Sequence, residues 1–149
     1  MPPALERTQP ALRITRSEGT RREQAASAIP LEGACHCGAI RLAALPAAPD
    51  TATSCNCSLC RRTGGLRACY ALGTVVIEGH PEHTESQVRG DRTPRNFRCR
   101  SCGIVTHREP IDPAPGARHG VNLRNFDPAL LDAVVVRRFD GAETWTFLD

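Results

Sequence analysis

Gly33-Ala-Cys-His-Cys-Gly-Ala-Ile-Arg41 decides the fold of this chain, because two thiols followed by glycine form a compact metal-binding turn. A second turn of this kind, Phe97-Arg-Cys-Arg-Ser-Cys-Gly103, lies far downstream. A glycine after the second thiol permits a left-handed backbone, so that amides turn toward the sulfur. Zinc accepts four sulfur ligands in tetrahedral geometry. The two turns therefore predict one closed, structural zinc site formed by Cys35, Cys37, Cys99 and Cys102.

The third cysteine cluster, Cys55-Asn-Cys-Ser-Leu-Cys60, supplies three thiols rather than four. Three thiolates leave one tetrahedral position for water or substrate, which is typical of catalytic zinc. Cys69 is the alternative fourth ligand and would close the site, although a cysteine in a predicted strand ordinarily serves as a small buried hydrophobe. The sequence thus predicts two zinc ions per chain, one structural and one catalytic, the second held by Cys55, Cys57 and Cys60.

Arginine supplies all 19 basic residues of the chain, and the net charge is +3. The absence of lysine excludes a Schiff-base lysine and a lysine general base. Arg61, Arg62 and Arg67 follow the three-thiol cluster, where guanidinium groups would lower thiol pKa values and hold the carboxylates of an anionic substrate. The alternative for each of these arginines is a solvated surface position.

The histidines carry a weaker signal than the cysteines. His107 and Glu109 follow the last cysteine turn on a predicted strand, where they could place a proton-transfer group near the open metal. His80 and His83 stand in a polar segment and are expected to be exposed. His119 has no recognisable context.

Length and composition predict one mainly β domain. The chain has 149 residues and only four Phe, one Trp and one Tyr, so metal sites must replace part of a large apolar core. Residues 1–30 are polar and are predicted to be a disordered extension, followed by a zinc-binding domain at 31–149. No apolar run approaches the roughly 20 residues that span a bilayer. We expect no membrane partner and a cytoplasmic location, where thiols stay reduced and disulfides are disfavoured.

The local patterns predict short antiparallel strands with little helix. Asp127-Pro128 predicts the start of one short helix, and residues 78–94 read as a polar loop. A hairpin is predicted from residues 134–139 and 143–147, which flank the turn at Asp140-Gly141. Further strands are predicted at residues 39–42, 67–72, 75–77 and 104–107.

The three cysteine motifs, in this order, resemble the glutathione-dependent formaldehyde-activating enzyme family, whose domain also occurs in centromere protein V. The resemblance covers roughly residues 31–149. It implies a zinc-stapled β-tent fold in which the four-thiol set holds structural zinc and the three-thiol set holds catalytic zinc. It also implies an activity that joins glutathione to formaldehyde to give S-hydroxymethylglutathione, classed as a carbon–sulfur lyase. Asn56 stands where the family commonly has histidine.

We therefore expect a zinc-dependent, carbon–sulfur lyase-like enzyme that joins a low-molecular-weight thiol such as glutathione to formaldehyde or another small aldehyde. The alternative is a non-catalytic, zinc-stabilised binding module for a protein or nucleic-acid partner. The small net charge and the few aromatic residues disfavour nucleic acid. Redox or metal sensing by the three-thiol cluster is a third reading. Nothing in the sequence fixes the oligomeric state.

Overall fold

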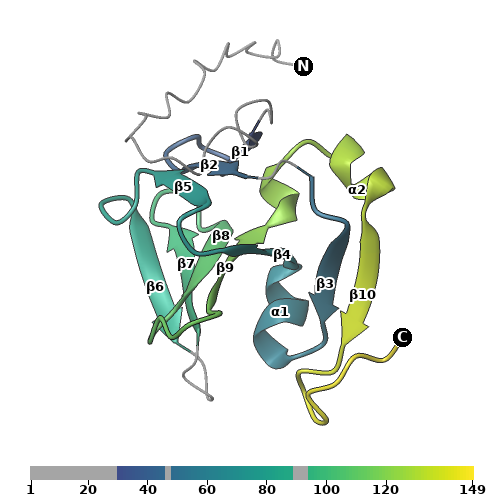
Figure 1. Cartoon of the computed structure of the whole chain (residues 1–149). Helices are drawn as coiled ribbons and strands as arrows, with labels where there is room; N and C mark the ends of the chain where they lie inside the picture. Colours follow the sequence, from purple (N-terminus) through teal and green to yellow (C-terminus); the bar gives the residue numbers. More distant parts are fainter. Residues whose placement is uncertain (1–29, 46–47, 89–93) are drawn as a thin grey trace.

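The computed structural model describes residues 30–45, 48–88 and 94–149 of the chain, and within them most regular structure is β (Figure 1). Ten strands in these ranges form a three-stranded sheet and a seven-stranded sheet. This confirms the predicted mainly β fold with little helix. The predicted disordered extension falls almost wholly outside the described residues.

The small sheet is antiparallel and lies across the upper end of the large sheet in Figure 1. Its order is β1 (Leu31–Ala34), β2 (Arg41–Ala44) and β5 (Val75–Glu78). The central strand β2 is almost fully buried, because it is covered by its two neighbours and by the core. The first cysteine turn connects β1 to β2, so the strand pair presents its thiols at one end of this sheet.

The large sheet is antiparallel except at one edge, where β10 pairs in parallel with β3 from Val135↔Thr51 to Phe139↔Cys55. In spatial order the strands are β10 (Val135–Phe139), β3 (Thr51–Cys55), β4 (Leu66–Ala71), β9 (Arg118–Asn122), β8 (Val105–Pro110), β7 (Pro94–Cys99) and β6 (Thr84–Val88). The last strand therefore runs beside the strand that ends at the three-thiol cluster.

The main core lies on one face of the large sheet. Strand β4 alternates, with Leu66, Ala68 and Tyr70 buried and Arg67 and Cys69 on the other face. The buried face packs with the inward residues of the small sheet and of the segment after β9; the core consists of Leu42, Ala44, Ala52, Leu66, Ala68, Tyr70, Val121, Leu123, Phe126 and Val134. Arg67 and Cys69 are thereby left on the opposite face.

The helices are short. α1 (Ser58–Thr63) begins after Cys57 and ends at Gly64, whose φ of 63° is left-handed. The other two are the 3-10 turn η1 (Leu123–Asn125) and α2 (Ala129–Ala133). The predicted short helix is present but begins one residue later, with Pro128 as its N-cap, and the Asp127 carboxylate accepts a hydrogen bond from the Ala129 N–H at 2.9 Å. In the described parts of the chain no helix has the length and apolarity needed to cross a membrane.

The four separate predicted strands are present with shifted ends, as β2, β4, β5 and β8. Five strands in the described ranges escape the sequence patterns: β1, β3, β6, β7 and β9. β6 lies inside the segment predicted as a loop. It is an edge strand in which only Thr84 is buried, so it shows no apolar alternation. β9 was not expected either, because its buried stretch Gly120–Asn122 includes glycine and asparagine.

The predicted C-terminal hairpin is wrong. β10 forms its ladder with β3, and the segment after Asp140-Gly141 returns only far enough for one bridge, between Phe139 and Phe147. A parallel partner more than 80 residues away in the sequence leaves no local signal, whereas an Asp-Gly turn gives a strong one.

Leu123 offers a test of this core, because its side chain is fully buried in η1 between the two sheets. We expect Leu123→Ala to lower the free energy of unfolding by about 2–5 kcal/mol, measured by urea denaturation. Leu72→Ala is the matched control, since Leu72 is 42% exposed after β4. It should change stability by less than about 0.5 kcal/mol. Equal decreases in the free energy of unfolding in the two variants would contradict the placement of Leu123 in the core.

Candidate functional site

The first cysteine cluster brings together the four thiols of the two cysteine–glycine turns. The Sγ atoms of Cys35, Cys37, Cys99 and Cys102 all lie within 4.8 Å of one another. Cys37 Sγ is 3.6 Å from both Cys35 Sγ and Cys99 Sγ. Tetrahedral zinc with bonds of about 2.3 Å separates its sulfur ligands by about 3.8 Å. The donor set and its spacing therefore fit a closed zinc site.

The backbone around this cluster supports the thiols as predicted. Gly38 and Gly103 are left-handed, with φ of 78° and 74°. Their N–H groups close the turns by donating to the carbonyls of Cys35 and Cys99, each at 2.9 Å. The Ile40 N–H donates to Cys35 Sγ at 3.3 Å. Because β7 ends at Cys99 while the other turn joins β1 to β2, this cluster links the large sheet to the small one.

The second cluster consists of Cys55 at the end of β3, Cys57 just before α1 and Cys60 within α1. All three side chains are buried, and their Sγ atoms lie within 4.8 Å of one another. The Cys57 N–H donates to Cys55 Sγ and the Cys60 N–H donates to Cys57 Sγ, each at 3.4 Å. Backbone donors aimed at sulfur stabilise thiolate charge, which is the ligand form.

Burial disfavours ionisation of the thiols in this cluster, so their thiolate forms depend on nearby positive charge or hydrogen-bond donors. It raises the pKa of Cys60 to about 12, and the nearby guanidinium of Arg67 only partly opposes it. Burial raises the pKa of Cys57 too, but hydrogen bonds, led by that from the Cys60 N–H, outweigh it and lower the pKa overall. Three thiolates this close repel one another, so a bound cation is what would allow all three to ionise.

Cys69 is not part of this cluster. It lies on β4, outside the group of thiols that approach within 4.8 Å, and its Sγ accepts a hydrogen bond from Arg108 Nη2 at 3.4 Å. The closed-site alternative, with Cys69 as fourth ligand, is therefore contradicted by the geometry. All eight cysteines are free thiols, as the sequence predicts.

The three-thiol cluster opens into two adjoining cavities. The inner one has a volume of about 110 Å³ and is lined by the three cysteines. The outer one has a volume of about 440 Å³ and lies along the polar face of the large sheet. Both are lined by Arg67, Pro94, Arg108, Phe139 and Trp145. We call the two together the cleft.

The arginines of the cleft differ from those that the sequence singles out. Arg67 lines both cavities, and its Nε is buried without a hydrogen-bond partner among the described residues. Arg61 and Arg62 are exposed on α1 and line neither cavity. Arg108 lines both and Arg118 lines the outer one. Alternation along β8 could have indicated that Arg108 faces the cleft, but only if the pairing of β8 with its neighbouring strands were known.

Known proteins can now be compared with this geometry. The family model described as glutathione-dependent formaldehyde-activating enzyme matches residues 30–129, and therefore spans all three cysteine motifs. The chain belongs to this family. A Halomonas elongata protein that carries the family's name is 37% identical over 83 residues. That alignment covers 48% of this chain and spans about half (51%) of the relative.

A solved structure supports the fold independently. The crystal structure of a Rhodobacter sphaeroides protein superposes with a TM-score of 0.57 at 32% sequence identity. The match covers 71% of this chain and 99% of the other. Family membership and fold thus agree with the resemblance inferred from the motifs.

The loop after β10, residues 140–146, completes the cleft beyond the family match. Asp140 accepts hydrogen bonds from Asn56 Nδ2 at 2.8 Å and from Thr144 Oγ1 at 2.8 Å, which lower its pKa to about 2. A Cβ on Gly141 would come within 2.5 Å of Cys55 Sγ, so only glycine leaves room for the thiol cluster. Asn56 thus ties the loop to the cluster from between two of its cysteines.

Three of the five histidines, His80, His107 and His119, gather on the other face of the sheet. Alternation along β8 puts His107 and Glu109 opposite Arg108, against the core side. His80 packs edge-on against Phe97 and His107, so its expected exposure is wrong, whereas His83 is exposed. His107 is also among the residues around a small cavity beside Cys60, but its imidazole contacts His80, Phe97 and Glu109. The structure therefore does not support proton transfer from His107 at the three-thiol cluster.

Trp145, the only tryptophan of the chain, reports on the loop that covers the cleft. We expect Asp140→Ala to lower its fluorescence anisotropy, because the hydrogen bonds that fix the loop are lost. Glu143→Ala is the matched control, since Glu143 is exposed in the same loop. An unchanged anisotropy in Asp140→Ala would show that Asp140 does not hold the loop.

Proposed function

We propose that this chain joins a low-molecular-weight thiol of the glutathione type to formaldehyde or another small aldehyde, as a carbon–sulfur lyase-like enzyme. The observation that carries the proposal is the opening of a three-thiol cluster into a cleft lined by arginines. Family membership supports the same chemistry, although the curated relative aligns over only part of its length. The outer cavity, at about 440 Å³, is within the range of small-ligand sites.

Two zinc ions per chain are part of the proposal. Cys35, Cys37, Cys99 and Cys102 would hold the structural ion, and Cys55, Cys57 and Cys60 would hold the catalytic one. A zinc ion bound by three thiolates supplies an open position that favours an ionised thiol or polarises an aldehyde oxygen. The buried thiols, the N–H donors around them and the nearby charge of Arg67 are what this chain contributes to such a site.

Arg67 and Arg108 give the cleft its selectivity for an anionic thiol. Glutathione carries two carboxylates, and a guanidinium group binds a carboxylate in bidentate fashion. The unpartnered Nε of Arg67 leaves donor capacity free for such a ligand. We assign this role to Arg67 in preference to Arg61 and Arg62, which are exposed on α1 and line neither cavity.

The aromatic side chains that line the cleft, Phe139 and Trp145, would exclude water from the reacting groups. The reaction itself is an addition: the thiol sulfur bonds to the aldehyde carbon, and the thiol proton ends on the aldehyde oxygen. No oxidant or reductant is consumed. The chain's contribution is to hold the two reactants together, which can lower a barrier by several kcal/mol.

The proposed reaction is tested by the exchange rate of formaldehyde with glutathione, measured by NMR with and without the protein. We expect acceleration by the wild type, and a rise in KM for glutathione of roughly 10- to 100-fold in Arg67→Gln. The reason is the loss of a charge-assisted hydrogen bond, worth about 1.5–3 kcal/mol.

Arg61→Gln is the matched control for this variant and should leave the KM unchanged. Zinc content, measured on the same samples, should be equal in all three proteins. No acceleration over buffer by the wild type would remove glutathione–formaldehyde condensation as the activity. An equal rise in the KM for glutathione in Arg61→Gln would show that the carboxylate binds at α1 instead.

The two cysteine clusters should respond differently to the loss of one ligand. We expect Cys57→Ser to lose one zinc relative to wild type while remaining folded. Cys102→Ser should unfold, because structural zinc contributes about 10–16 kcal/mol and a domain's net stability is only about 5–15 kcal/mol. The measurements are elemental analysis and thermal unfolding.

Cys69→Ser is the matched control and should lose no metal, because Cys69 lies outside both clusters. If Cys57→Ser unfolds as Cys102→Ser does, the three-thiol cluster is structural and its catalytic assignment fails.

A further inference from the structure

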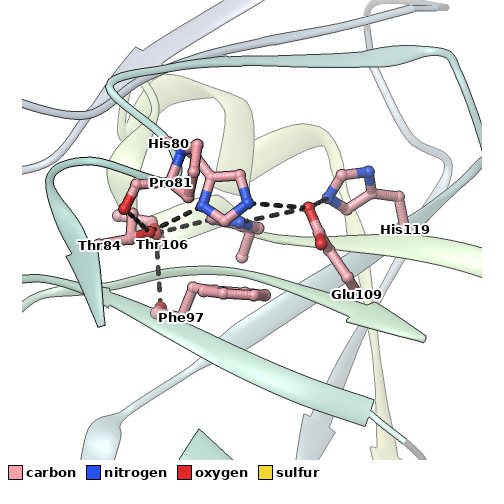
Figure 2. Close-up of polar contacts among 8 residues, drawn as sticks. His80, Pro81, Thr84, Phe97, Thr106, Glu109 and His119 are labelled. Atoms are coloured by element: carbon pink, nitrogen blue, oxygen red, sulfur yellow. Dashed lines mark hydrogen bonds and ion pairs between the residues drawn. The ribbon is translucent and has the colours of Figure 1, made fainter. Parts of the chain in front are cut away.

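Three imidazoles converge on one carboxylate oxygen on the core side of the large sheet. Glu109 Oε1 lies 3.6 Å from His80 Nε2, 3.6 Å from His107 Nε2 and 3.4 Å from His119 Nε2. Figure 2 shows the Glu109 carboxylate reaching toward His119 on one side and the other imidazoles on the other. Neither the cysteine motifs nor the family match accounts for this group, which we call the histidine cluster.

The fold assembles the histidine cluster from three separate segments. His107 and Glu109 are two residues apart on β8, so they share a face. The β8–β9 register, with His107 opposite Val121 and Arg108 opposite Gly120, places His119 across from Glu109 when continued by one pair. His80 comes from the turn after β5, a strand of the small sheet. The cluster therefore spans both sheets.

The distances in the cluster fit metal coordination better than hydrogen bonding. Hydrogen bonds between nitrogen and oxygen measure about 2.7–3.2 Å. Bonds of about 2.1 Å from a tetrahedral ion to nitrogen and oxygen place neighbouring ligands about 3.4 Å apart. The observed separations are 3.4–3.6 Å. The ligand atoms of His80, His107 and Glu109 all lie within 4.8 Å of one another, while His119 borders this group through Glu109.

The other ring nitrogens are held in the manner of metal-binding histidines. His80 Nδ1 pairs with Thr84 Oγ1 at 2.7 Å, and His107 Nδ1 pairs with Thr106 Oγ1 at 2.9 Å. Such bonds fix the ring and aim Nε2 at the ligand position. Phe97 adds a stacked contact with His107 at 4.6 Å between ring centroids.

The Nε2 atoms of His107 and His119 are buried and have no hydrogen-bond partner among the described residues. A buried nitrogen without a partner costs free energy, which a bound ion would recover. Burial, with smaller effects of His80 and His119, also lowers the pKa of His107 to about 3. The imidazole is therefore neutral at neutral pH, which is the form that binds metal.

We propose that His80, His107 and Glu109, with His119 at their side, form a third metal site for a divalent first-row transition ion, of which zinc fits the tetrahedral spacing. Imidazole and carboxylate are suitable ligands for such an ion. The ion cross-links the turn after β5 to β8 and β9 and so ties the two sheets together at a second point. The Glu109 side chain is 33% exposed, which leaves the ion a route from solvent.

This proposal is independent of the proposed reaction, and its test measures metal content. Full-length protein expressed with saturating zinc is analysed for metal per chain, as wild type, His80→Ala, Glu109→Gln and His83→Ala. We expect wild type and His83→Ala to carry one equivalent more than the other two. His83 is the matched control because it stands exposed in the same turn as His80.

Expression with cobalt in place of zinc gives a second readout on the same proteins. The thiolate-to-cobalt charge-transfer band of the cysteine clusters should be unchanged in His80→Ala and Glu109→Gln, which shows that the fold is retained. The weaker visible bands of a nitrogen–oxygen site should be lost from both. Loss of the charge-transfer band as well would show that the residues serve the fold generally, and would overturn the proposal.

The metal content of the wild type tests the proposal even if the variants fail to fold. A saturated wild-type protein whose metal is fully accounted for by the cysteine clusters would overturn the proposal. Equal metal content in all four proteins would do the same, and would identify the cluster as a histidine–glutamate polar network without an ion.

Discussion

The four-thiol cluster is the constraint on which the rest of this structure depends. It connects the turn between β1 and β2 to the end of β7, and so fixes the small sheet on the large one. The core between the sheets contains three alanines and only two aromatic residues, Tyr70 and Phe126. Small side chains bury little area, so the zinc ion proposed for this cluster would supply stability that packing alone does not.

Once the sheets are fixed, strand alternation divides the chemistry between two faces. On β4, Arg67 and Cys69 face the cleft while Ala68 and Tyr70 enter the core. On β8, Arg108 faces the cleft while His107 faces the core side. A shift of one residue in the register of either strand would exchange these sets. Packing of the core face fixes the register of these strands, and the register in turn places Arg67 and Arg108 in the cleft.

The sequence predicted those parts of the site that short motifs carry. Both cysteine clusters, the left-handed glycines after the thiols and the mainly β fold follow from local spacing. Arg108 and Arg118 could not be predicted, because they reach the cleft from β8 and β9, and β9 has no apolar alternation. Arg61 and Arg62 were predicted to bind substrate because they follow Cys60 in the sequence, but they are exposed and do not line the cleft.

The parallel pairing of β10 with β3 explains why the cleft of this chain extends past the residues that the family model matches. The family match ends at residue 129, whereas Phe139, Gly141 and Trp145 line the inner cavity. They reach it because β10 runs beside the strand that ends in Cys55, and Asn56 then binds the loop that follows. The thiol cluster and the wall that covers it thus come from segments far apart in the sequence. Substitutions in residues 139–147 can therefore alter the shape of the cleft while leaving the cysteines of the three-thiol cluster unchanged.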